Sequence, residues 1–233
     1  MDVLTIRASA PLQSYGNQAT FNRRTTHHYP TKSAVIGLVA AALGLRREDA
    51  AIQSLNQLKY ALRIDQVGQT MTDFQIVETN RPKKGARKIT YRDYLQDYVY
   101  MIALGSEDMD LIRIISYALL HPKFQLYWGR RSNPPAGVLQ VGMFKNTDPI
   151  AVLTHLLPWQ ASSWYQRKQK EATFEAELIA DSSLLPQAPR TMIKDLVGSF
   201  DQRNRFHRYR SVAKTRVTLQ NPQYQEHDVM TYL

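Results

Sequence analysis

The chain has 233 residues, of which 43% are hydrophobic, enough to fill the core of one large domain. Thirty Lys and Arg against 20 Asp and Glu give a formal net charge of +10, which favours a polyanionic partner such as nucleic acid. The lack of cysteine excludes disulfides and thiolate metal sites. The six histidines show no pair with the spacing of helical ligands, so we expect no metal and no cofactor.

Membrane insertion and export are not indicated. The amino-terminal residues include an early acid and no long apolar stretch, unlike a signal peptide. The longest apolar run, residues 34–43, is well short of the roughly 20 residues that a membrane helix needs. We therefore expect a cytoplasmic protein without membrane contact.

The first elements follow clear periodicities. Alternation predicts a strand over residues 3–8, and a turn-rich segment follows to Pro30. Thr31 and Gly44 then have the residue types that begin and end a helix over residues 32–43. The nearly all-round apolar surface of this helix predicts burial against a sheet.

The middle of the chain predicts a long inserted hairpin. A short helix over residues 48–58 and a strand over residues 60–65 come first. Residues 70–77 and 89–94 then fit paired strands within a thumb of about residues 70–96, whose tip either follows a nucleic-acid backbone or is a solvated loop. The basic residues of the tip are Arg81, Lys83, Lys84, Arg87 and Lys88.

The remaining elements complete a recognisable order. We expect a strand over residues 98–104, a helix from Ser106 to Leu120 and a strand over residues 137–144. Strand, helix, strand, strand, helix, strand is the ferredoxin-like pattern, an α+β fold with two helices on one face of a four-stranded antiparallel sheet, here over residues 1–146.

The last third has weaker signals. Asp148 and Pro149 predict a helix to about Leu157, and residues 173–179 and 206–219 are strand candidates. These segments lack the hydrophobic content of an independent core. We therefore expect residues 147–233 to form a β-rich extension packed on the first domain.

Several motifs carry a family resemblance. They are residues 12–16, 21–25, 29–38, 43–49, 72–74, 92–95 and 127–132, in that order along the chain. Together they resemble the CasD family of CRISPR-associated proteins, a branch of the repeat-associated (RAMP) RNA-binding superfamily. The resemblance implies a ferredoxin-like domain with a protruding β-hairpin thumb and a β-rich carboxyl-terminal extension.

The resemblance also implies a function and partners. It points to a subunit of the type I-E Cascade complex, in antiviral defence, that binds the 5′ handle of the CRISPR RNA (crRNA). Such a subunit caps the filament of backbone subunits and contacts the large subunit. Target DNA would be recognised indirectly, through base pairing with the guide.

A helix start provides the first candidate RNA contacts. Thr31, Lys32 and Ser33 open the buried helix, so backbone N–H groups, the helix dipole and an ammonium group converge on a spot suited to phosphate. A simple capped helix with a surface lysine is the alternative. The nearby Arg23 and Arg24 favour RNA binding.

A loop provides the second set of candidate RNA contacts. Gly129, Arg130, Arg131 and Ser132 precede two prolines, and the two guanidinium groups can bind phosphate or stack on a base, or else be solvated.

Two further sets are more ambiguous. Gln13 and Tyr15 could read or stack an unpaired base, although Tyr15 fits core packing equally well. The carboxyl-terminal candidates for phosphate contact, which could equally form a solvated face, are Arg203, Arg205, Arg208 and Arg210.

Catalysis is the minority hypothesis. A related type I-C branch is a metal-independent endoribonuclease, and here His27 or His28 could act as base with help from Tyr15 or Lys32. The motifs look closer to the type I-E branch, in which a separate subunit cuts the RNA. We therefore expect no catalytic residues.

Overall fold

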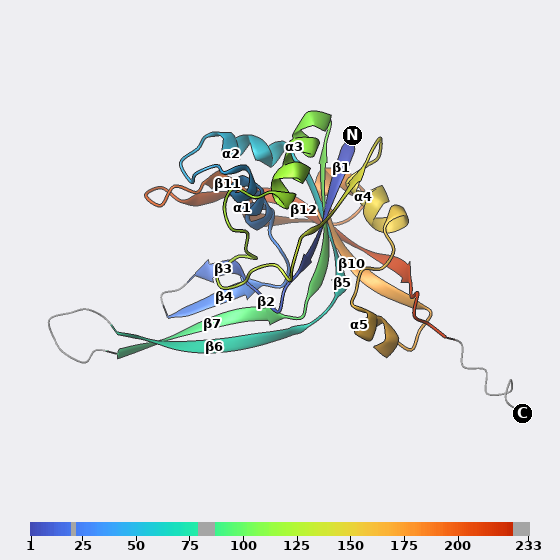
Figure 1. Cartoon of the computed structure of the whole chain (residues 1–233), viewed down its shortest axis with the longest axis horizontal. Helices are drawn as coiled ribbons and strands as arrows, with labels where there is room; N and C mark the ends of the chain where they lie inside the picture. Colours follow the sequence, from blue (N-terminus) through green and yellow to red (C-terminus); the bar gives the residue numbers. More distant parts are fainter. Residues whose placement is uncertain (20–21, 79–86, 226–233) are drawn as a thin grey trace, which may run out of the picture.

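The computed structural model describes residues 1–19, 22–78 and 87–225. Its main sheet has seven strands in the order β11-β12-β10-β5-β8-β1-β9 (Figure 1). The strands are β1 (Asp2–Ser9), β5 (Lys59–Gln66), β8 (Val99–Ser106), β9 (Gln140–Phe144), β10 (Thr173–Asp181), β11 (Arg190–Ser199) and β12 (Phe206–Gln220). Neighbouring strands pair antiparallel throughout this sheet.

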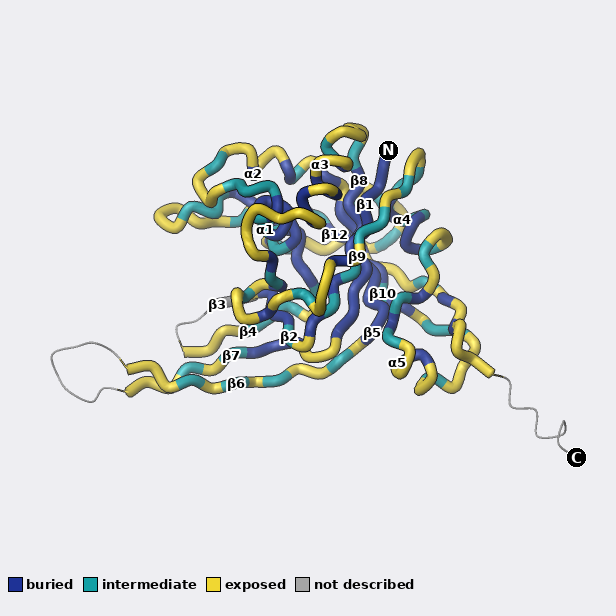
Figure 2. Tube along the Cα trace, viewed as in Figure 1, coloured by how far each residue is buried: buried dark blue, intermediate teal, exposed yellow. Residues whose placement is uncertain are grey.

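Helices cover both faces of the central strands. On one face, α1 (Lys32–Leu43) and α3 (Met109–Leu120) share a core with apolar residues of β1, β5 and β8. On the other face lie α4 (Pro149–Ala151) and the π-helical turn η2 (Val152–Leu156). Neighbouring residues such as Val3 and Leu4 enter different cores, as strand periodicity requires. Figure 2 shows these strands as the buried centre.

The capped helix α1 is confirmed. The Oγ1 atom of Thr31 accepts a hydrogen bond from the Ala34 amide at 3.3 Å, and Gly44 ends the helix in the left-handed region with φ of 79°. The helix expected over residues 48–58 is shorter, because α2 (Ala51–Ser54) gives way to the 3₁₀ turn η1 (Leu55–Gln57). Two other short helical segments were not predicted, α5 (Ser163–Lys168) and η3 (Ser182–Leu184).

The carboxyl-terminal third continues the main sheet. Strand β10 is hydrogen-bonded to β5, with Leu178 opposite Arg63 and Ala180 opposite Ala61. Several apolar residues of the last third enter two cores shared with the first two thirds. A further small core consists of residues of the last third alone, namely Trp159, Ala161, Ala176 and Leu219. Strand β11 was missed, because its centre contains Lys194 and Asp195 instead of alternating apolar residues.

A second sheet corrects the prediction of a turn-rich segment before Pro30. It contains β2 (Leu12–Gln13), β3 (Tyr15–Ala19), β4 (Arg23–His27), β6 (Gln69–Glu78) and β7 (Arg87–Gln96). Its order is β2-β7-β4-β3, with β6 paired to β7. Polar composition hid β4, whose pairing with β7 is parallel and joins residues far apart in sequence.

The predicted long hairpin is formed by β6 and β7. The two strands pair along their length, from Gln69 opposite Gln96 to Glu78 opposite Arg87. It extends away from the body of the molecule (Figure 1). Arg87 and Lys88 are exposed. The expected tip residues Arg81, Lys83 and Lys84 lie outside the described residues.

Within the described ranges, no helix is both long enough and apolar enough to cross a membrane.

Candidate nucleic-acid interface

The loop that carries Arg130 and Arg131 is fixed against the start of the second sheet. The Ser14 amide donates to the Trp128 carbonyl at 3.2 Å, and the Asn133 amide donates to the Arg130 carbonyl at 2.9 Å. Gly129 has φ of 85°, and a Cβ atom there would lie 1.6 Å from the Ser14 carbonyl oxygen. Only glycine permits this approach, so its position in the motif has a steric cause.

Arg130 is held over an aromatic ring. Its Cζ atom lies 4.4 Å from the centre of the Tyr94 ring, and its Nη2 atom donates to the Arg24 carbonyl at 3.2 Å. Its Nη1 atom is shielded from solvent and has no acceptor in the part of the chain that the structure describes. The side chain is therefore oriented, yet one strong donor remains unused.

Arg92 adds a second unused donor beside it. Arg24 on β4 is in register with Arg92 on β7, so both side chains lie on one face, together with Tyr94 two residues further on. The Nε atom of Arg92 is buried and, among the described residues, has no acceptor. We call Arg24, Arg92 and Arg130 the arginine cluster.

The arginine cluster has the chemistry of an anion site. A buried donor without an acceptor costs about 1–3 kcal/mol, and more when it is charged. Phosphate oxygens would satisfy guanidinium donors with strong charge-assisted hydrogen bonds. Arg92 and Tyr94 were not predicted as RNA contacts, although their two-residue spacing on a strand could have indicated that they share a face.

The remaining predicted loop residues lie beside the cluster. Gly129, Arg131 and Ser132 are exposed. Arg23 lies on the opposite face of its strand from Arg24, and its guanidinium group is 3.7 Å from the Asp93 carboxylate. The structure therefore brings Arg24 and Arg130 together, with Arg131 and Ser132 next in the same loop and Arg23 directed to the other face.

Burial corrects the expectation that Gln13 and Tyr15 read a base. They are 0% and 1% exposed. The Gln13 side-chain amide donates to the Tyr98 carbonyl at 2.8 Å, and the Tyr15 hydroxyl donates to the Gln13 Oε1 atom at 2.5 Å. Burial also raises the pKa of Tyr15 well above its ordinary value. These two side chains support the loop from beneath.

The phosphate site expected at Thr31, Lys32 and Ser33 is also corrected. The Lys32 amide already donates to the Asp195 carboxylate at 2.9 Å, and its ammonium group donates to Asp181 at 3.2 Å. Lys32 is only 4% exposed. Ser33 is 3.2 Å from the Thr31 hydroxyl. An internal carboxylate thus occupies the anion position at the start of α1.

Arg210 completes this buried network and is not a free phosphate contact. It donates to Asp195 at 2.9 and 2.7 Å and to Asp181 at 2.6 Å. Burial lowers its pKa, but hydrogen bonds to Asp195 and the charges of both carboxylates outweigh burial, so the pKa is raised. Arg203, Arg205 and Arg208, in contrast, are exposed.

The residues considered for catalysis are not assembled. Burial lowers the pKa of the half-buried His27, with the Asp195 charge opposing it, and His28 is exposed. The proposed helpers Tyr15 and Lys32 are engaged in the interior. A search of the described residues finds no cluster of three or more His, Cys, Asp or Glu that could hold a metal ion.

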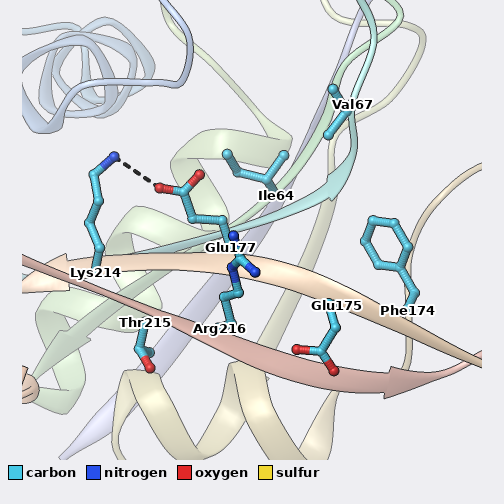
Figure 3. A pocket seen from close by; sticks show the side chains of 8 residues that line it. All are labelled: Ile64, Val67, Phe174, Glu175, Glu177, Lys214, Thr215 and Arg216. Atoms are coloured by element: carbon cyan, nitrogen blue, oxygen red, sulfur yellow. Dashed lines mark hydrogen bonds and ion pairs between the residues drawn. The ribbon is translucent and has the colours of Figure 1, made fainter.

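A groove of about 580 Å³ lies between β5 and the β10–β12 pair (Figure 3). Ile64, Val67 and Phe174 form its apolar part. Its charges are mixed, since Glu177 pairs with Lys214 at 2.9 Å and Glu175 lies nearby. Its two carboxylates are balanced by Lys214 and Arg216, so the groove has no surplus of positive charge and is a poorer anion site than the arginine cluster.

Comparisons with known proteins show the family of this chain. The family model described as CRISPR-associated protein (Cas_Cas5) matches residues 3–218. The Cascade subunit CasD of Escherichia coli (strain K12) is 31% identical over an alignment of 172 residues. The match covers 66% of this chain and 77% of that protein.

Solved structures of CRISPR-associated proteins are also similar to this chain. A chain of a CRISPR RNA-guided surveillance complex superposes with a TM-score of 0.75 and 26% identity, covering 97% of this chain and 95% of that one. A second structure, described as a Cas protein, has a TM-score of 0.66 and 25% identity over 96% of this chain and 98% of its own. The chain belongs to the CRISPR-associated Cas5 family, in which the CasD protein is its relative.

Proposed function

We propose that this protein is a non-catalytic, cytoplasmic subunit of a type I-E Cascade surveillance complex that holds the 5′ handle of the crRNA with its arginine cluster. The observation that carries the proposal is the pair of buried, unused donors, Nε of Arg92 and Nη1 of Arg130. A phosphate of the handle would supply the missing acceptors. The names of the E. coli relative and of the superposed complex support this assignment.

We also propose a ferredoxin-like assignment for the body of residues 1–146. The support is the strand order β9-β1-β8-β5 with α1 and α3 on one face. Within it, the cluster lies where the long hairpin joins the body.

The two faces of the long hairpin support a role at the junction of RNA and protein. Phe74 is opposite Tyr91 and Ile76 is opposite Ile89, and all four side chains are 45–63% exposed on one face. The other face carries Lys88 and Arg92, with Asp73 opposite Arg92. An exposed apolar face fits a neighbouring protein, here a backbone subunit of the filament, while the basic face fits the guide RNA. Contacts with the large subunit, and with target DNA through the guide, belong to the same proposal.

The test is co-expression with the other complex genes and a CRISPR array, followed by pull-down through this chain and sequencing of the RNA 5′ ends. The parent should yield uniform ends with a short repeat-derived handle. Combining Arg92→Gln and Arg130→Gln should reduce the retained RNA by about tenfold or more, because two charge-assisted contacts are lost.

The matched control is Arg113→Gln, which removes an exposed arginine on α3 that pairs with Asp110 at 3.3 Å within its own helix. It should retain RNA as the parent does. Undiminished RNA in the double variant would contradict the assignment of the handle to this cluster. Cleavage of repeat RNA by the purified chain would favour the endoribonuclease alternative.

A further inference from the structure

The hairpin of β11 and β12 has an outer surface to which the proposed function gives no role. Its inner side chains, including Asp195, Val197 and Arg210, pack toward α1. Figure 1 shows this hairpin on one side of α1 and the second sheet, with the arginine cluster, on the other.

The outer surface is strongly basic. The exposed cationic side chains of the hairpin and its tip are Arg190, Lys194, Arg203, Arg205 and Arg208. Between residues 190 and 216 the sequence contains only two acids, Asp195 and Asp201, and Asp195 is buried. The balance of charge on this surface therefore complements a polyanion.

Exposed aromatic rings lie among these cations. Tyr209 is 63% exposed, and the Lys194 ammonium nitrogen is 5.9 Å from the centre of its ring. Phe206 and Arg208 form a separate pair on the opposite face of β12, because they alternate with Tyr209 along the strand and the register shifts of this hairpin fall on β11. Accessible rings beside flexible cations are the combination that binds an unpaired strand, because bases stack on the rings while the cations contact phosphates.

We infer that the face of the β11–β12 hairpin that carries Tyr209 is a second nucleic-acid site, which binds an unpaired strand through stacking on Tyr209. Lys194 and Arg205 neutralise phosphates of the same strand. A duplex, whose bases are already stacked on one another, would gain only the phosphate contacts. The site is independent of the arginine cluster because it belongs to the other sheet.

The experiment measures binding of a fluorescein-labelled 15-nucleotide DNA strand to the full-length chain by anisotropy. Tyr209→Ala should weaken binding about tenfold, since a lost stacking contact has that magnitude. The control Tyr117→Ala removes a tyrosine that is 67% exposed on α3 and should bind as the parent does. Combining Lys194→Gln and Arg205→Gln should reduce the salt slope by about 1.4, because two phosphate contacts are lost.

The same tenfold loss from Tyr209→Ala should persist in a chain that already carries Arg130→Gln, which separates this site from the proposed handle site. Binding of an RNA strand of the same sequence shows which nucleic acid the site prefers. Tighter binding of RNA than of DNA supports guide RNA as the ligand, and tighter binding of DNA supports a target strand. Parent-like affinity of Tyr209→Ala, or a duplex that binds as tightly as the single strand, would overturn the inference.

Discussion

Gly129 shows how one residue makes the candidate site possible. Its backbone has φ of 85°, and the Ser14 carbonyl oxygen occupies the space that a side chain would need. The close approach brings the following residue, Arg130, over the Tyr94 ring. The glycine of the motif is thus part of the support for the guanidinium group.

Gly137 offers a matched comparison at the same scale, since its φ is 83° but nothing lies within 4 Å of its missing Cβ. Gly137→Ala should cost about 1–2 kcal/mol of unfolding free energy from backbone strain alone. Gly129→Ala should cost roughly 3 kcal/mol or more, because a steric clash is added. Urea unfolding of both variants measures the difference, and equal losses would contradict the argument from close approach.

At the scale of elements, helix α1 is joined to the last third of the chain by charge. Its first residue, Lys32, contacts both Asp181 and Asp195, which Arg210 bridges from β12. Burial lowers the pKa of Lys32, and the Asp181 charge opposes this effect. The helix start is therefore a structural junction with its anion position already filled.

Asp195→Ala should lower the unfolding free energy by about 3–5 kcal/mol, because it removes two of the three hydrogen bonds from Arg210 to carboxylates and the acceptor of the Lys32 amide. Combining Asp195→Leu with Arg210→Met should cost less than the sum of the single changes, since no uncompensated guanidinium group remains. The control Lys214→Ala breaks the exposed pair with Glu177 and should cost at most about 1 kcal/mol. Additive losses in the double variant would argue against a coupled network.

At the scale of the whole molecule, the two cores depend on both parts of the chain. Leu178 and Ala180 of β10 pack with Ala61 and Met101 in one core. Ile179 and Val212 enter the other core, below α1. The main sheet is consequently built from strands of the first and last thirds together.

A chain ending at residue 146 should therefore lack a cooperative thermal transition and should bind a hydrophobic dye, since it loses the partner of β5 and the cover over one sheet face. Circular dichroism during heating and dye fluorescence test this expectation. The full-length chain, as control, should unfold in one transition. A shortened chain with a sharp transition near that of the parent would show that residues 1–146 fold alone.

The sequence by itself determined the class of protein and the order of its central elements. Alternating and helical periodicities predicted β1, α1, β5, β8, α3 and β9, because each buries a regular apolar face that can be read locally. Net charge indicated a polyanionic partner, and the ordered motifs indicated the family that the comparisons then matched.

Only the tertiary structure decided which polar residues are accessible for contact with RNA. Gln13, Tyr15, Lys32 and Arg210 looked like RNA contacts in sequence but are buried with partners. Arg92 was not predicted as an RNA contact, yet it lies in register with Arg24 through a parallel pairing of distant strands. Such pairings follow no local periodicity, since they depend on hydrogen bonds and charges between residues that only the folded chain brings together.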